Sequence, residues 1–153
     1  MKSLAKLITA LLLISSVFVL SGCGNTSGIP DGSTITVGPD FKQTGVAFFA
    51  VPVDYTVVVR YADKTPIPNA KVNIAGHYAT TSTFFPGVYQ FYRFADPNSP
   101  TNVAVNSPFD VVTDDNGEYT FSVLISAFSG TFADTIEARS GTALGSAVLQ
   151  VNQ

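Results

Sequence analysis

The sequence has no tryptophan and only one cysteine, Cys23, and one histidine, His77, among its 153 residues. Charged residues make up 12% of the chain, and there is no run of basic residues. A single cysteine cannot form a disulfide within the chain, and one cysteine with one histidine provides too few of the usual ligands for a zinc site. An acidic chain without a basic run is a poor candidate for binding nucleic acid, and the absence of tryptophan disfavours a carbohydrate-binding module. What the chain has in plenty is Val, Thr, Ser and Phe, a mixture that favours strands over helices.

The first 22 residues have the pattern of a secretory signal peptide. Lys2 and Lys6 form a positive region, and Leu7–Leu20 follows as 14 residues without a charge. A membrane-spanning helix needs about 20 apolar residues, so this run fits a signal peptide better than a transmembrane anchor. Removal of residues 1–22 leaves six basic and eleven acidic residues, a net charge of −5. We interpret this acidity as favouring solubility.

The next stretch, Leu20-Ser21-Gly22-Cys23, resembles the lipobox of bacterial lipoproteins. The resemblance implies that the signal peptide is cut before Cys23, that the thiol carries a diacylglycerol, and that the new amino terminus is acylated, typically with palmitate. Two or more acyl chains hold a protein stably on a bilayer. Gly24 stands where an Asp tends to retain enteric lipoproteins at the inner membrane, so the resemblance points to the outer membrane, facing the periplasm or the cell surface. The alternatives are a signal peptide followed by an ordinary buried cysteine, and a membrane-spanning anchor.

The remaining chain divides into a tether and one domain. Residues 23–40 are rich in Gly, Ser, Thr, Asn and Pro and are interpreted as the lipidated cysteine with a flexible tether. About fifteen such residues span roughly 20 Å on average. Within the tether, Ile35–Val37 has the pattern of a first edge strand. Residues 41–153 are long enough for a single domain with a sizeable core.

Strict alternation of apolar and polar residues dominates this domain. The clearest case is Glu118–Ser126, where Tyr119, Phe121, Val123 and Ile125 share one face. Period two with one apolar face predicts antiparallel strands that are half exposed to water. The same period is found in four further segments, 55–61, 70–75, 135–139 and 147–151. About seven short strands separated by turns predict an all-β, Ig-like antiparallel β-sandwich.

Turn residues separate the predicted strands. Asp63–Asn69 is a Pro-rich connection, because Pro66 and Pro68 cannot donate ladder hydrogen bonds. Asp114-Asp115-Asn116-Gly117 predicts a hairpin, since Asn and Gly tolerate positive φ. Ser129-Gly130 and Ser140-Gly141 predict two more turns.

Two pieces of the domain together resemble a known family. The first runs from Val57 to Ile74 through the Pro-rich connection, and the second runs from Val112 to Gly141 through Thr113-Asp114-Asp115-Asn116-Gly117. They resemble the bacterial Ig-like group 1 domains of invasins and intimins over residues 53–153, which implies a non-catalytic Ig-like module. Carboxypeptidase regulatory-like domains of the transthyretin type share these motifs and remain the alternative. The stretch 75–107 is longer than the usual connection of the family, and a single copy argues against an extended adhesive stalk.

No catalytic or metal-binding residue is predicted. His77 has no free cysteine beside it, and we interpret it as a solvated turn residue. No G-x-S-x-G nucleophile motif is present. Asp114, Asp115, Asn116 and Glu118 could supply oxygen ligands to calcium, but their spacing is not that of an EF-hand and a turn explains them already. No cofactor is expected.

The feature that the predicted fold does not require is an aromatic segment with seven rings between residues 78 and 94. If 88–94 is a strand, Tyr89 and Phe91 share one face, and Tyr92 and Phe94 share the other. One face can serve the core, while the other must be covered or must meet a partner. The candidate partner surface is therefore drawn from Tyr89, Phe91, Tyr92 and Phe94.

Two functions fit these observations. The first is a non-enzymatic outer-membrane lipoprotein, anchored through Cys23, whose Ig-like domain is a structural or adhesive interaction module for another envelope or surface protein. The second is a small-ligand or carbohydrate-binding lipoprotein with a transthyretin-like fold and a pocket among the 78–94 aromatics. A polar cluster at the base of a pocket would favour the second, whereas a filled aromatic cluster would argue against it.

Overall fold

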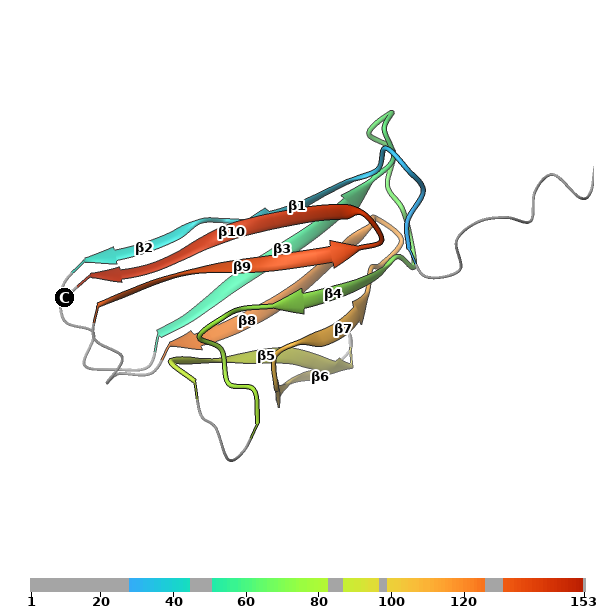
Figure 1. Cartoon of the computed structure of the whole chain (residues 1–153). Helices are drawn as coiled ribbons and strands as arrows, with labels where there is room; N and C mark the ends of the chain where they lie inside the picture. The colour runs from blue at the N-terminus through green and yellow to red at the C-terminus, as the bar shows by residue number, and fades with distance from the viewer. Residues whose placement is uncertain (1–27, 45–50, 83–86, 97–98, 126–130, 153) are drawn as a thin grey trace, which may run out of the picture.

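The computed structural model describes residues 28–44, 51–82, 87–96, 99–125 and 131–152. The predicted signal peptide and Cys23 lie outside these residues, as do most of the apolar run 45–53 and the predicted turn at Ser129-Gly130. The described residues form ten strands in two facing sheets (Figure 1). They contain no helix with the length and hydropathy needed to cross a bilayer.

Each sheet has five strands. The first sheet contains, in spatial order, β1 (Thr34–Gly38), β3 (Val51–Arg60), β8 (Glu118–Ile125), β5 (Tyr89–Asp96) and β6 (Ser99–Val105). The second contains β2 (Phe41–Thr44), β10 (Ala143–Asn152), β9 (Phe132–Ser140), β4 (Lys71–Ala75) and β7 (Phe109–Val112). All pairings are antiparallel except that of β2 with β10, which is parallel.

The strand order is that of an Ig-like sandwich, as predicted. In the usual lettering the first sheet has the order A-B-E-D and the second has G-F-C, with β1, β3, β4, β5, β8, β9 and β10 as strands A to G. These are the seven strands of the basic fold. The three further strands are β2, which adds to strand G, and β6 and β7, which arise in and just after the long stretch 75–107.

The core is built from the alternating apolar faces. Val57 and Val59 of β3 and Phe121 and Val123 of β8 have no exposed side-chain area. Tyr61, which continues the alternation of β3, is 39% exposed because the strand ends at Arg60. The alternation thus predicts the buried face of β3 and β8 correctly, up to the residue at which the strand ends.

The predicted hairpin at Asp114–Gly117 is wrong, although the turn itself is present. The Asp114 N–H donates to the Glu118 carbonyl at 2.8 Å, and Gly117 has a φ of +69°. The flanking strands nevertheless belong to different sheets, since β7 pairs with β4 while β8 pairs with β3 and β5. The segment is a tight corner between the sheets. The turn at Ser140-Gly141 does join a hairpin, that of β9 and β10.

The strand predicted at Ile35–Val37 is present as β1, which pairs with β3. Ile35 is 6% exposed and belongs to the core. The sandwich therefore includes residues of the stretch 23–40, and described structure begins at Gly28.

Candidate functional site

The aromatic segment divides between the core and the surface. Tyr89 and Phe91 have no exposed area. The Phe91 ring lies with its centroid 5.2 Å from that of Phe109 and 5.7 Å from that of Phe121. Tyr89 and Phe91 are therefore wrong as partner-surface residues, because the inward face of β5 packs against the second sheet. They fill a closed aromatic cluster, which argues against a ligand pocket at this place.

The opposite face of β5 points away from the core. Tyr92 is half-buried there and lies beside Ser122 of β8 and Ala104 of β6 in the strand register. Ser122 in turn donates to Asp54 at 2.6 Å. The side chain of Phe94 lies outside the described residues. Of the predicted partner surface, Tyr92 is the one member that the structure describes on an outer face.

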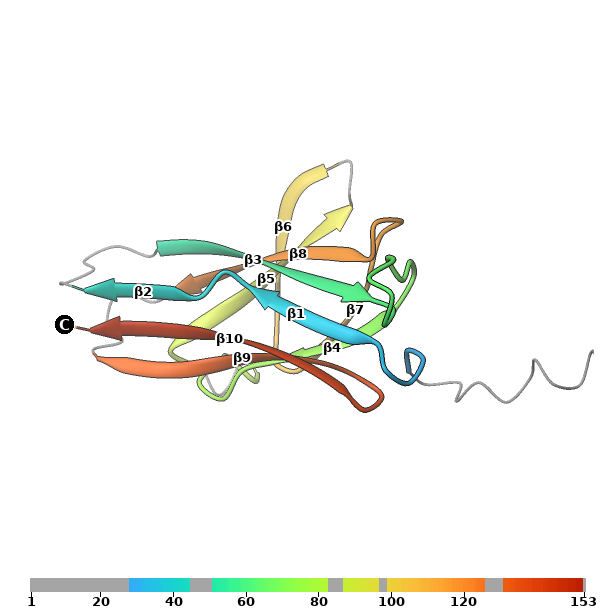
Figure 2. The same ribbon diagram turned by 90° about the horizontal axis from the view of Figure 1, so that it is seen from above.

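The edge strand β6 is the candidate interaction site. It pairs with β5 on one side and forms the edge of the first sheet on the other. Asn102, Val103 and Ala104 are exposed, and none of its seven residues carries a charge. Seen from above, β6 stands out from the body of the sandwich (Figure 2). An uncharged, exposed edge can pair with an extended strand of another chain through backbone hydrogen bonds.

The other described edges are less accessible to such pairing. The edge at β1 is covered by β10. The two backbones are close there, because a Cβ added at Gly145 of β10 would lie 2.6 Å from the carbonyl oxygen of Ile35 in β1. The edges at β2 and β7 are four residues long and carry Lys42 and Asp110, respectively. Charged side chains, short length, proline and bulges are the usual protections of an edge strand. In β6 the proline and the irregular register with β5 lie at its start, before the exposed residues 102–104. The signal for β6 in the sequence is its uncharged run after Pro100, but its position at an edge depends on the topology.

A carboxylate near one end of the sandwich organises the start of β5. Asp134 accepts a hydrogen bond from the Tyr89 hydroxyl at 2.8 Å and another from the Tyr78 N–H at 2.7 Å. Burial of the Tyr89 hydroxyl, followed by its hydrogen bond to Asp134, raises the pKa of Tyr89 far above its ordinary value. A phenol held this firmly in its protonated form positions the strand and is not poised for proton transfer.

His77 lies at an exposed position in the connection after β4. Its ring is exposed and meets the Tyr78 ring edge-on, with 4.7 Å between the centroids. Among the described residues no group of three or more His, Cys, Asp or Glu side chains could hold a metal ion. In the oxygen-rich turn at Asp114, the Asp114 Oδ1 atom accepts hydrogen bonds from the N–H groups of Asn116 and Glu118 at 2.9 and 2.8 Å. That carboxylate stabilises its own turn.

A groove of about 670 Å³ lies on the outer face of the second sheet. Arg139 and Asn73 are neighbours across β9 and β4, and Asn73 donates to Asp110 of β7 at 2.8 Å. Arg139 pairs with Glu137 at 2.8 Å. Asn73 and Arg139 are thus each paired with a carboxylate of a neighbouring residue on the sheet.

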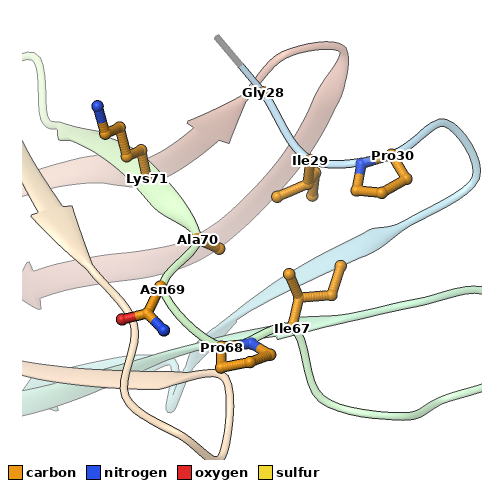
Figure 3. Close-up of a pocket in the computed structure, with 8 residues that line it drawn as sticks. All are labelled: Gly28, Ile29, Pro30, Ile67, Pro68, Asn69, Ala70 and Lys71. Carbon is orange, nitrogen blue, oxygen red and sulfur yellow. The ribbon is translucent and has the colours of Figure 1, made fainter. Parts of the chain in front are cut away.

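A smaller hollow of about 240 Å³ lies where the described chain begins (Figure 3). Its walls are Gly28–Pro30 on one side and Ile67–Lys71 on the other. Ile29 packs against the core, and Ile67 is 6% exposed. The hollow marks the contact between the amino-terminal segment and the connection from β3 to β4.

No protein-family model matches the chain, and no curated protein matches its sequence. Among solved structures, a conjugative transposon lipoprotein from Bacteroides eggerthii aligns at 7% identity with a TM-score of 0.48, over 81% of this chain and 100% of that one. AvmM, which catalyses macrocyclization in alchivemycin A biosynthesis, aligns at 10% identity and a TM-score of 0.42, over 85% of this chain and 94% of that one. The sulfur carrier SoxY from Chlorobium limicola aligns at 18% identity and a TM-score of 0.29, over 81% of this chain and 76% of that one. With all three TM-scores below 0.5, these similarities carry no argument about function, and the fold assignment stands on the strand order.

Proposed function

We propose that this protein is a bacterial lipoprotein of the outer membrane, anchored through acylated Cys23, whose Ig-like domain binds another envelope or surface protein without catalysing a reaction. The observation that supports acylation is the motif Leu20-Ser21-Gly22-Cys23 at the end of a short apolar run. Cys23 lies five residues before Gly28, the first residue that the structure describes. Acyl chains at this position would hold the domain at the bilayer.

The exposed edge of β6 supports the binding role. An incoming extended segment would add a sixth strand to the first sheet, with its backbone paired to β6. Val103 lies in register with Arg93 and is 40% exposed, so the added strand would also cover apolar surface. The interaction would thus combine backbone hydrogen bonds with a small apolar contact.

Metabolic labelling with an alkyne fatty acid tests the anchor. We expect the wild-type chain to take up the label and to stay with the membrane fraction, and a Cys23→Ala variant to do neither. A wild-type chain that remains unlabelled and keeps its leader would contradict the lipoprotein proposal.

Site-specific photo-crosslinking on whole cells tests the edge. A photoreactive residue at position 103 in β6 is compared with one at position 112 in β7, since Val103 and Val112 are both exposed valines on edge strands. We expect a defined adduct at position 103, absent at position 112, that disappears when Ala104→Lys places a charge on the edge. Equal crosslinking at both positions, or an adduct insensitive to the lysine, would argue against β6.

A further inference from the structure

We propose that the end of the sandwich at Gly28 faces the membrane and that the strands extend away from it, so that Asn152 lies at the outward end. This orientation rests on the proposed acylation of Cys23. It follows from the contact that holds Gly28 against Gly141 and from how few residues separate Gly28 from the anchor.

The chain enters the domain at a fixed point. A Cβ added at Gly28 would lie 2.8 Å from the Gly141 Cα, so the two backbones are in direct contact. Ile29 then packs against the core, and the Pro30 carbonyl accepts a hydrogen bond from the Ser33 N–H at 3.2 Å. Figure 3 shows Gly28 to Pro30 running beside Ile67 to Lys71. Gly28 is therefore held against the body of the sandwich.

The distance from the anchor to this point is short. Cys23 and Gly28 are five residues apart, which a fully extended chain spans in about 17 Å at most. The nine residues of β9 alone are about 30 Å long at roughly 3.4 Å per residue. The body is thus longer than its attachment.

The surfaces that meet at the Gly28 end are polar turns. The register of β1 with β3 and of β4 with β9 brings together the turns at 31–33, 61–69, 114–117 and 140–142. These turns and the start of β4 carry four carboxylates and two ammonium groups, namely Asp31, Asp63, Asp114, Asp115, Lys64 and Lys71. Such a surface sits at the headgroups and does not insert into the hydrocarbon.

Charge favours an upright body over one lying on its side. The described strands and their connections belong to the stretch with eleven acidic and six basic residues, a net charge of −5. An anionic bilayer repels such a body, and the repulsion is screened by salt over about 8 to 10 Å at physiological ionic strength. The attachment holds the Gly28 end near the bilayer despite a net charge of −2 on its turns and the start of β4, and the repulsion keeps the rest of the body, with the remaining −3, away.

The test uses the full acylated chain in vesicles of phosphatidylethanolamine and phosphatidylglycerol. Because Cys23 is acylated, an engineered cysteine is the free thiol for a fluorescent donor. Thr142→Cys and Ala133→Cys form a matched pair, since both residues are exposed and lie at opposite ends of the β9–β10 hairpin. We expect energy transfer to headgroup-labelled lipid to be several-fold stronger from position 142 than from position 133, and the difference to shrink in high salt.

A chain with twenty Gly and Ser residues inserted between Ser27 and Gly28 is the control, and it should lose most of the difference. Equal transfer from the two positions of an anchored chain, or stronger transfer from position 133, would overturn the orientation alone. A chain that leaves the vesicles while Cys23 itself reacts with the dye would overturn the lipid anchor together with the orientation.

Discussion

The two ends of the sandwich are built in different ways. The Gly28 end is closed by short turns in which a carboxylate accepts from backbone N–H groups of its own turn, as Asp63 does from the Thr65 N–H at 3.0 Å and Asp114 from the Glu118 N–H at 2.8 Å. Among the described residues of the Asn152 end, side chains from distant segments meet, as in the hydrogen bond from Tyr89 to Asp134 at 2.8 Å. The turns of the first end thus have hydrogen bonds of their own, and Thr113 and Gly117 also join them to other segments. The hydrogen bond from Tyr89 to Asp134 at the second end forms only when the two sheets are assembled.

The largest effect is expected from Gly117→Ala at the Gly28 end. Gly117 has a φ of +69°, and an added Cβ would lie 2.5 Å from the Val59 carbonyl oxygen. The strained backbone and the collision together should cost about 3 kcal/mol or more of unfolding free energy. Urea denaturation measures the loss. Gly38→Ala is the control, because a Cβ there meets nothing within 4 Å, and an equal effect of the two variants would contradict the account.

Thr113→Val should be the next most damaging change at the same end. The Thr113 hydroxyl is buried, accepts from the Ala70 N–H at 2.9 Å and donates to the Ile67 carbonyl at 2.9 Å. Valine keeps the shape but leaves both backbone groups unpaired, at a cost of about 1–3 kcal/mol. The exposed Thr135→Val should change stability by less than about 0.5 kcal/mol. A loss of stability in Thr113→Val no larger than that in Thr135→Val would show that the buried hydroxyl is not needed.

At the Asn152 end, Tyr89→Phe should cost about 1.5–3 kcal/mol, the range for a hydrogen bond to a charged group. Because the folded-state pKa of Tyr89 is raised, its contribution is complete below the unfolded value of about 10 and is lost as the pH rises above it. Burial raises the pKa of Tyr119 as well. Stability of the wild-type chain should therefore fall above pH 10, and less steeply in Tyr89→Phe. Parallel pH profiles of the two proteins would refute the role of this hydroxyl.

The smallest effect is expected from Glu118→Gln. Glu118 pairs with Arg60 at 3.2 Å on the outer face of the first sheet, with both side chains partly exposed. An exposed pair of this kind contributes about 0.2–1 kcal/mol, and salt should reduce it further. Thermal unfolding at low and high salt would measure the difference, and a loss that persists unchanged in high salt would show that packing, not charge, is involved.

The sequence predicted the parts of the fold that depend on alternation and on turn chemistry. The buried faces of β3 and β8 follow from period two, and the turns at Asp114–Gly117 and Ser140-Gly141 follow from residues that tolerate positive φ. The hairpin expected at Asp114 failed because a tight turn constrains only its own residues. Whether the strands beside it pair with each other depends on the rest of both sheets.

The candidate site was predictable only in part. Alternation along β5 separates Tyr89 and Phe91 from Tyr92, but it cannot tell which of the two faces is inward, since both carry rings. Tyr89 and Phe91 face inward because Phe109 and Phe121, which come later in the chain, pack on Phe91. The edge position of β6 likewise depends on which strands find partners.

The sequence by itself determined an all-β domain, the inward face of its regular strands, its main turns and the Leu20–Cys23 motif, because each of these is written in neighbouring residues. Tertiary structure alone decided the partner of each strand, the parallel addition of β2 to β10, and the open edge at β6. The physical reason is that side-chain period specifies which face a strand buries, whereas strand partners are selected by the packing of the whole sandwich.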